Sequence, residues 1–383
     1  MGRAQAGDRP GTRLFRPGRV DAEPWTVDSC VGAGHYAGCE AERKVCGIVT
    51  AVETGLLDTF GRRAVDLRVS VTDRCNLRCT YCMPEEGLQW LAKDTLLTDE
   101  EIVRLVGIAV GELGVREVRF TGGEPLLRPG IVGIVAACAQ LTPRPELSLT
   151  TNGIALSRTA QALRDAGLDR VNVSVDTLDP ATFKTLTRRD RLDDVHAGLA
   201  AAEAVGLRPV KLNAVLMRGV NDHEAADLLA YALEHGYELR FIEQMPLDAQ
   251  HGWDRSKMIT AEEILERLSA RFTLTPEPDE RRGAAPAERW LVDGGPARVG
   301  VIASVTRPFC RACDRTRLTA DGQIRNCLFA TEETDLRGAL RAGAGNAEIA
   351  ELWRKAMWGK KAAAGIDDPS FHQPERPMSA IGG

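Results

Sequence analysis

The chain lacks any apolar run long enough to cross a membrane as a helix, and aromatic residues make up only 5% of its 383 residues. It also lacks an excess of basic residues, because its net charge is −5. A spanning helix needs about 20 consecutive apolar residues, so we expect a soluble protein without a membrane partner. The mild acidity argues against a nucleic-acid binder that works through a basic face. Any anionic ligand would need a local cluster of positive charge.

A secretory signal peptide and a disulfide framework are missing as well. No apolar h-region follows the N-terminus, and ten cysteines in a chain of this length do not resemble a small secreted scaffold. Clustered cysteines then indicate metal or redox sites in a reducing compartment. We expect the cytoplasm, or the mitochondrial matrix if the source is eukaryotic. Residues 1–20 are rich in arginine, as presequences can be, but Pro10, Gly11, Pro17 and Gly18 would interrupt an amphipathic helix.

Composition divides the chain into three parts. Residues 1–55 are rich in Gly, Pro and Arg, show no sustained period, and are expected to form a poorly ordered extension. Residues 56–285 alternate between apolar runs and segments of helical period. Residues 286–383 form a different, cysteine-bearing C-terminal region. The segment 275–296 between them is rich in Pro, Gly and charge, which favours a boundary or an exposed excursion.

The central part predicts an α/β fold with parallel strands. Thr98 with Glu101, and Thr260 with Glu263, carry the capping-box signature of a helix start, and Ser157 is a good N-cap for a third helix. Six βα units are compatible with an open sheet or with a partial barrel, and in both the active site lies at the carboxyl ends of the strands. The expected strands are 65–71, 117–121, 147–150, 170–175, 210–217 and 238–243.

Directly after the first expected strand, Cys75, Cys79 and Cys82 are spaced C-x3-C-x2-C. A closed zinc site needs four ligands, and no further cysteine or histidine lies near in sequence. Three thiolates can instead hold three irons of a [4Fe–4S] cube, which leaves the fourth iron open to a small molecule. The alternatives are an incomplete zinc site or a chance cluster.

At the end of the second expected strand the chain reads "RFTGGEPLLRP" (119–129). Gly122 and Gly123 can expose backbone to a close ligand, and Glu124 can accept from an ammonium group. Taken alone, this stretch is equally typical of a tight turn.

A second cysteine triad, Cys310, Cys313 and Cys327, is spaced C-x2-C-x13-C and again has no fourth member nearby. A second open iron–sulfur cluster is the main interpretation. A zinc site completed by a distant residue such as His372 is the alternative.

Charged residues near this triad favour an anionic ligand. Arg315 and Arg317 alternate on an extended segment, so both can point the same way and can bind phosphate or stack on a purine. A solvated basic strand is the alternative. Lys211 is unusual inside an expected buried strand, where a charge is rarely tolerated without a partner. The final Gly382 and Gly383 could thread into a pocket, although most tails are disordered.

Taken together, these motifs resemble the radical S-adenosylmethionine (SAM) superfamily, and within it the branch that acts in molybdenum cofactor biosynthesis. The resemblance runs from about residue 57 to the C-terminus, through "SVTDRCNLRCTYCMPEEG", "RFTGGEPLLR", "LTTNG", "VNVSVDTL", "RFIEQMP", the second triad and the final Gly-Gly. One departure is Asp314, where Asn is frequent, but it leaves both following arginines intact.

The resemblance implies a partial (β/α)6 barrel that the C-terminal region closes, two [4Fe–4S] clusters and SAM. It implies that the first cluster reduces SAM, that the radical formed takes the 3′ hydrogen of GTP, and that C3′ then adds to C8 of guanine. The protein would orient the reactants and exclude quenching. The second cluster would bind the guanine through its open iron.

The resemblance also assigns roles to single residues. The tail glycines and Arg317 would assist the reaction, and Arg240 is a further inward-facing cation. Asn152 is a plausible neighbour of SAM. The positions that match SAM contacts are Tyr81, Gly123, Glu124, Ser174 and Met245. The positions that match GTP contacts are Arg68, Arg119, Thr150, Lys211, Arg315 and Arg317.

Partners follow from the same resemblance: an external electron donor of flavodoxin or ferredoxin type, and a downstream cyclic pyranopterin monophosphate synthase. A homodimer is possible. Two other readings of the sequence remain open, a radical SAM enzyme that modifies a peptide or RNA, and a non-enzymatic zinc-binding interaction protein. Cys138 is expected in the core. Cys30, Cys39 and Cys46 in the extension are interpreted as incidental, with an extra metal site as the alternative.

Overall fold

The computed structural model describes residues 55–278, 282–368 and 370–382. The expectations for the extension, including Cys30, Cys39 and Cys46, and for Gly383 lie outside the described residues.

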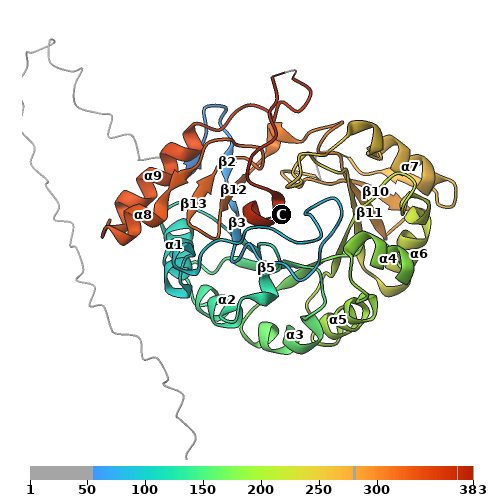
Figure 1. The fold of residues 1–383 in the computed structure, drawn as a ribbon, viewed down its shortest axis with the longest axis horizontal. Helices are drawn as coiled ribbons and strands as arrows, with labels where there is room; N and C mark the ends of the chain where they lie inside the picture. The colour runs from blue at the N-terminus through green and yellow to red at the C-terminus, as the bar shows by residue number, and fades with distance from the viewer. Residues whose placement is uncertain (1–54, 279–281, 369, 383) are drawn as a thin grey trace, which may run out of the picture. The chain divides into compact units, whose positions relative to one another are not determined.

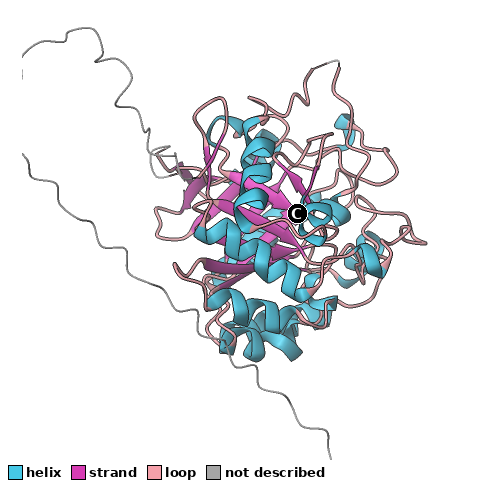
Figure 2. Ribbon diagram, turned by 90° about the vertical axis from the view of Figure 1, so that its left-hand side faces the viewer, coloured by secondary structure: helices cyan, strands magenta, loops and turns pink. Residues whose placement is uncertain are grey.

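The core of the fold is a run of six neighbouring parallel strands, which confirms the six expected βα units. The chain order of these strands is also their order in the sheet, and helices between them lie on the outside (Figure 1). In the turned view of Figure 2 the strands again lie inside and helices cover their outer side. The six strands are β3 (Asp66–Ser70), β4 (Glu117–Thr121), β5 (Glu146–Thr151), β6 (Arg170–Ser174), β7 (Lys211–Val215) and β8 (Glu238–Ile242).

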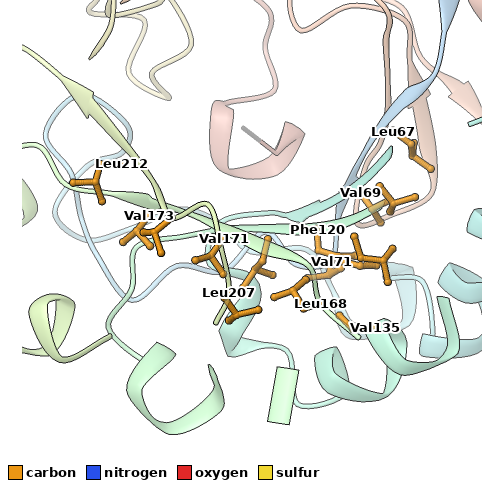
Figure 3. Close-up of a cluster of buried hydrophobic side chains, with 14 of the residues drawn as sticks. Leu67, Val69, Val71, Phe120, Val135, Leu168, Val171, Val173, Leu207 and Leu212 are labelled. Carbon is orange, nitrogen blue, oxygen red and sulfur yellow. The ribbon is translucent and has the colours of Figure 1, made fainter. Parts of the chain in front are cut away.

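Each of these strands alternates apolar and polar residues, and this alternation separates the hydrophobic core from the inner face of the sheet. Leu67, Val69 and Phe120 are fully buried and join one hydrophobic cluster (Figure 3). Because neighbouring residues of a strand point to opposite faces, Arg68 and Arg119 then point to the inner face. The alternation therefore places polar side chains inside the ring of strands and apolar ones against the helices.

Two of the three predicted helix starts are confirmed. Thr98 and Thr260 both form capping boxes, at α1 and α7. The prediction for Ser157 is wrong, because α3 already begins at Leu156 and Ala155 precedes it without a side-chain cap. The helices between the core strands, together with α7 after β8, are α1 (Asp99–Gly111), α2 (Ile131–Ala139), α3 (Leu156–Asp165), α4 (Pro180–Thr187), α5 (Leu192–Ala204), α6 (Ala225–His235) and α7 (Ala261–Ser269).

The C-terminal part of the chain extends the sheet at both edges. β11 (Arg298–Ile302) pairs in parallel with β8, and β10 (Glu288–Val292) and β9 (Leu274–Pro276) follow it. The segment 275–296, which was expected to be a boundary or excursion, begins in β9 and contains β10, and these two strands pair antiparallel with each other.

At the other edge β12 (Arg315–Leu318) pairs in parallel with β3, and β13 (Gln323–Arg325) and β14 (Thr334–Asp335) follow it. This pairing brings the segment after the second cysteine triad beside the strand that leads into the first.

Cys138, in α2, is fully buried, as expected for a core residue. Among the described residues, no helix combines the length and the apolar composition that crossing a membrane requires. The remaining strands and helices are β1 (Leu56–Leu57), β2 (Arg63–Ala64), α8 (Leu336–Arg341), α9 (Asn346–Trp358) and α10 (Met378–Ile381), the last of which lies within the ring of strands in Figure 1.

Candidate functional site

Three arginines lie at one level on the inner face of three adjacent strands. Arg317 of β12 is in register with Arg68 of β3, and Arg68 is in register with Arg119 of β4. All three side chains are buried. Strand order thus collects cations from positions 68, 119 and 317 into one row.

Asp66 supports this row from one level below. Its carboxylate accepts from Arg68 Nε and Nη2, at 3.0 Å each, and lies 3.5 Å from Arg315 Nε. Burial raises the pKa of Asp66. The nearby guanidinium groups of Arg68, Arg119 and Arg315 outweigh this effect and hold the pKa well below its usual range. The carboxylate is therefore charged and fixes the guanidinium planes of Arg68 and Arg315.

The row continues across the other core strands with mixed charge. Lys211 lies 3.2 Å from Glu238, so its unusual place in a strand has a local partner and is a weaker sign of function than the sequence indicated. Arg240 donates to Asn213 Oδ1 and Asn172 Oδ1, as an inward-facing cation, and Asn172 also donates to Thr150 Oγ1.

The buried cations repel each other. Burial lowers the pKa of Arg317 to about 9, and Arg68 and Arg315 add to this effect. Burial likewise lowers the pKa of Arg240 to about 10, although Glu238 opposes the shift. Such depressed pKa values mean that the guanidinium groups lack sufficient counter-charge, so an incoming anion would be bound favourably.

The first triad, Cys75, Cys79 and Cys82, lies in the loop that follows β3. Burial raises the pKa of Cys75 to about 11 and of Cys82 to about 12. Burial also raises the pKa of Cys79, and the nearby thiols of Cys82 and Cys75 add to this shift. Binding to a metal would remove these protons. The residues that the first motif predicted are therefore gathered at the carboxyl end of β3.

The GGEP turn packs directly on this loop. Gly123 N–H donates to Thr72 O at 2.8 Å, and Glu124 N–H donates to Arg74 O at 2.7 Å. A Cβ on Gly123 would collide with the carbonyl oxygens of Asp73 and Arg74. The structure thus gives this glycine a packing reason in addition to the predicted access for a ligand.

Glu124 is almost fully buried, and the chain itself supplies several of its partners. Its carboxylate accepts from Thr151 Oγ1 and from the Asn152 N–H, at 2.7 Å each, and from the Leu126 N–H at 3.0 Å. Asn152 also donates to Asn76 Oδ1 at 2.7 Å, and its Nδ2 lies 4.0 Å from Cys75 Sγ. Glu124 and Asn152 therefore connect the carboxyl end of β5 to the cysteine loop.

Tyr81, the residue before Cys82, is held by a partner that the sequence did not reveal. Its hydroxyl donates to Asp176 Oδ2 at 2.7 Å, and Asp176 Oδ1 accepts from Val215 N–H at 2.9 Å. Ser174, the last residue of β6, is half-buried two positions before this carboxylate. The nearest signal in the sequence was the acid directly after the apolar run 170–175.

The second triad lines one cavity of about 80 Å³. Its walls include Arg315 and Arg317, and also Met245, which the sequence had associated with SAM. Asn326, next to Cys327, was not predicted. The cavity is lined by Met245, Ser304, Pro308, Phe309, Cys310, Cys313, Arg315, Arg317, Asn326, Cys327, Leu328, Phe329 and Ala364.

The final segment of the chain contacts both the cation row and the first triad. Arg376 binds Asp321 through Nη1 and Nη2 at 3.0 and 3.1 Å, and Glu333 through Nε and Nη2 at 2.9 and 2.8 Å. Beyond it, Ser379 N–H donates to the Cys82 thiol, which lowers the pKa of that thiol against the dominant effect of burial. Arg317 Nη1 donates to Gly382 O at 2.5 Å. The segment therefore connects the cation row with the first triad.

Both triads fit an iron–sulfur cluster better than a single ion. Within the described ranges, no three Cys, His, Asp or Glu side chains gather closely enough to hold one metal ion, so a zinc site completed by His372 gains no support. Each cysteine of a [4Fe–4S] cube binds a different iron, so its ligands stand farther apart than those of one ion. Each triad has no fourth cysteine beside it among the described residues, and three thiolates are the number that leaves one iron of a cube open.

Two family models match the chain. Residues 69–232 match the radical SAM superfamily, and residues 237–366 match Molybdenum Cofactor Synthesis C.

Curated relatives carry one shared name. The chain is 75% identical over 328 residues to "GTP 3′,8-cyclase" of Streptomyces coelicolor, which covers 86% of this chain and 96% of the relative. It is 62% identical to the protein of the same name from Mycobacterium sp. (strain KMS), over 86% of this chain and 93% of that one.

Solved structures agree on the fold. Streptococcus suis SuiB bound to S-adenosylmethionine matches 76% of this chain and 68% of its own, with a TM-score of 0.54 and 14% identity. The structure of anSMEcpe with bound AdoMet matches 78% of this chain and 78% of its own, with a TM-score of 0.52 and 15% identity. Together with the identity to relatives over nearly their full length, these findings show that the chain belongs to the GTP 3′,8-cyclase family of the radical SAM superfamily.

Proposed function

We propose that this chain is a lyase that converts GTP and SAM into 3′,8-cyclo-7,8-dihydro-GTP, 5′-deoxyadenosine and methionine, in the first step of molybdenum cofactor biosynthesis. The relatives' shared name and the two family matches support the reaction. The single observation in this chain that carries it is the row Arg317–Arg68–Arg119 beside the second triad.

The cation row gives GTP a reason to bind here. A triphosphate is the kind of ligand that several converging guanidinium groups bind best, because each group can form paired hydrogen bonds to phosphate oxygens. Since burial and mutual repulsion lower the pKa of Arg317 and Arg119, phosphate charge would relieve an existing imbalance. We assign GTP contacts to Arg68, Arg119, Thr150, Lys211, Arg315 and Arg317.

The carboxyl ends of β3 to β6 supply the residues for SAM. A [4Fe–4S] cluster on Cys75, Cys79 and Cys82 would supply the electron that cleaves the carbon–sulfur bond of SAM. Around it the GGEP turn and Asn152 hold the cysteine loop in place, and Tyr81 is oriented by Asp176. We assign SAM contacts to Tyr81, Gly123, Glu124, Ser174 and Met245.

The second triad and the final segment complete the site. Cys310, Cys313 and Cys327 would hold a second [4Fe–4S] cluster whose open iron takes the guanine. Gly382 contacts Arg317, and we propose that Gly382 and Gly383 help to position the reacting sugar. In this proposal residues 56–285 form the radical SAM part and residues 286–383 form the auxiliary region.

The remaining partners are also proposals. A flavodoxin or ferredoxin would supply electrons, and a cyclic pyranopterin monophosphate synthase would consume the product. A cytoplasmic location is supported by the bacterial relatives and by cysteines that are all unpaired among the described residues.

The experiment that tests this function is anaerobic turnover of GTP with SAM and dithionite, followed by mass analysis of the nucleotide and of deoxyadenosine. A cyclised GTP isomer that forms together with 5′-deoxyadenosine would support reaction, substrate and cofactor at once. Deoxyadenosine without a GTP product would keep the radical SAM chemistry and move the substrate to a peptide or RNA. Neither product, from protein with full iron content, would refute the proposal.

A further inference from the structure

Lys360 is a buried lysine that forms no ion pair with a carboxylate of the described residues. Its side chain is only 4% exposed, and none of the aspartate or glutamate residues in the described ranges forms an ion pair with it. Lysine is rarely buried unless its charge is compensated. An anion is therefore expected within reach of its ammonium group.

The contacts of Lys360 point to one atom. Its Nζ donates to Arg315 O at 2.8 Å and to Cys313 O at 3.2 Å, and it lies 3.3 Å from Cys313 Sγ. The two carbonyls are neutral. The sulfur of Cys313 is the one contact that can carry a full negative charge, as a metal-bound thiolate does.

The ammonium group is held in this place by the fold. Lys360 follows α9, whose Trp353 and Met357 are buried in the core, and its own N–H donates to Met357 O. Trp353 Nε1 also donates to Thr316 Oγ1 on β12, next to Arg315. The end of α9 is therefore fixed against the strand that follows Cys313.

Cys313 and Cys310 therefore differ in their contacts with nearby cations. Lys360 Nζ lies 3.3 Å from the sulfur of Cys313. At Cys310, Arg62 Nη1 donates instead to the backbone oxygen, at 2.6 Å.

We propose that Lys360 is a positioning residue of the second cluster, which donates a charged hydrogen bond to the Cys313 thiolate and thereby raises the reduction potential of that cluster. Hydrogen bonds to the sulfurs and net charge are two of the factors that set such potentials. A cation beside the ligand favours the reduced, more negative cluster. This inference rests on the part of the proposed function that gives the second triad an iron–sulfur cluster.

The test uses the full chain with Cys79→Ala, so that the second cluster alone gives the signal of the reduced protein. In that background Lys360→Met removes the charge and keeps the length of the side chain, and Lys360→Arg keeps the charge. Lys361→Met is the matched control, because it is the neighbouring lysine and is exposed. Each protein is reconstituted anaerobically, its iron and sulfide are counted, and its midpoint potential is measured by electron paramagnetic resonance during a redox titration.

We expect Lys360→Met to shift the midpoint potential to more negative values, with Lys360→Arg close to the parent and Lys361→Met unchanged. An unshifted potential in Lys360→Met would overturn the inference. If Lys360→Met folds but loses iron while Lys360→Arg retains it, the charge requirement is supported; loss in both variants would mean that shape alone matters and would refute it. A parent protein without a second cluster would instead refute that part of the proposed function.

Discussion

The two cysteine triads lie in different electrostatic surroundings. Near the first, burial is the main cause of the raised pKa of each thiol, and a nearby carboxylate adds to it: Glu124 at Cys75, Asp176 at Cys79 and Asp248 at Cys82. Arg78 opposes the shift at Cys75. Near the second, the neighbours are cations. Arg62 lowers the pKa of Cys310 against the dominant effect of burial, and Lys360 and Arg315 do so at Cys313.

This difference matches what each site would have to do. Negative surroundings disfavour the reduced form of a cluster and push its potential down, and reduction of a sulfonium needs a strong reductant. Positive surroundings raise a cluster's potential and also attract an anionic nucleotide. One type of ligand set can therefore serve as electron source at one place and as substrate anchor at another.

The largest expected effect is the loss of SAM cleavage when only the first triad is disrupted. Cys79→Ala should abolish SAM cleavage, because its cluster cannot assemble, while the second cluster remains. The measurement is 5′-deoxyadenosine formed with dithionite, alongside iron content. Retained cleavage would show that Cys75, Cys79 and Cys82 are not the electron source.

Arg317→Ala tests the cation row beside the second triad. We expect cyclisation to fall roughly 100-fold, about 2.7 kcal/mol of transition-state stabilisation, because a phosphate contact and the bond to Gly382 are lost together. SAM should still be cleaved when GTP is present, and Arg317→Lys should recover part of the product. The ratio of deoxyadenosine to cyclised product measures this, and a wild-type ratio would show that Arg317 has no role in positioning GTP.

Arg376→Ala tests the final segment, which connects the cation row with the first triad. Removing its bonds to Asp321 and Glu333 should loosen residues 377–382 and lower kcat roughly tenfold with little change in the KM for SAM. Arg208→Ala, which breaks a surface pair with Glu203, is the matched control and should have no effect. Hydrogen exchange of the final segment gives an independent readout, and unchanged exchange in Arg376→Ala would contradict the anchoring role.

The smallest expected effect concerns the negative surroundings of the first triad. Burial raises the pKa of Glu124 from 4.5 to about 7, and the N–H and hydroxyl donors offset this only in part. Since the folded state holds this proton more tightly than the unfolded state, its contribution to the free energy of unfolding is fully present below pH about 4.5 and is lost as the pH rises through about 7.

Glu124→Gln should therefore flatten the dependence of stability on pH between about 4.5 and 7 in protein without iron. Chemical unfolding at several pH values measures it. Equal slopes in the variant and the parent would show that folding does not raise the pKa of Glu124.

Sequence patterns predicted those structural features that depend on residues close together along the chain. The period of two predicted all six core strands, and the Thr-x-x-Glu signatures predicted the starts of α1 and α7. Ser157 failed as a cap because the chain enters α3 from a turn at Gly153 and Ala155, where backbone geometry alone starts the helix. Within the segment 275–296 the composition did not reveal β10, because its pairing with β11 makes it a strand.

Lys211 shows that a contact between two strands could not be predicted from the sequence alone. Its charge seemed unsupported in the sequence, but Glu238 on the next strand is in register with it. Asp176, Asp66 and Lys360 were missed for the same reason, since each acts on a residue that another part of the fold brings close.

The sequence by itself determined the two cysteine spacings, the GGEP turn, the alternation that sends arginines inward and the family to which the chain belongs, because these depend on neighbours along the chain. Only the tertiary structure decided that β12 lies beside β3, so that Arg317 and Arg68 share one level, and that the end of α9 places Lys360 against Cys313. The physical reason is that strand order and helix docking follow from packing of the whole hydrophobic core, which no local pattern specifies.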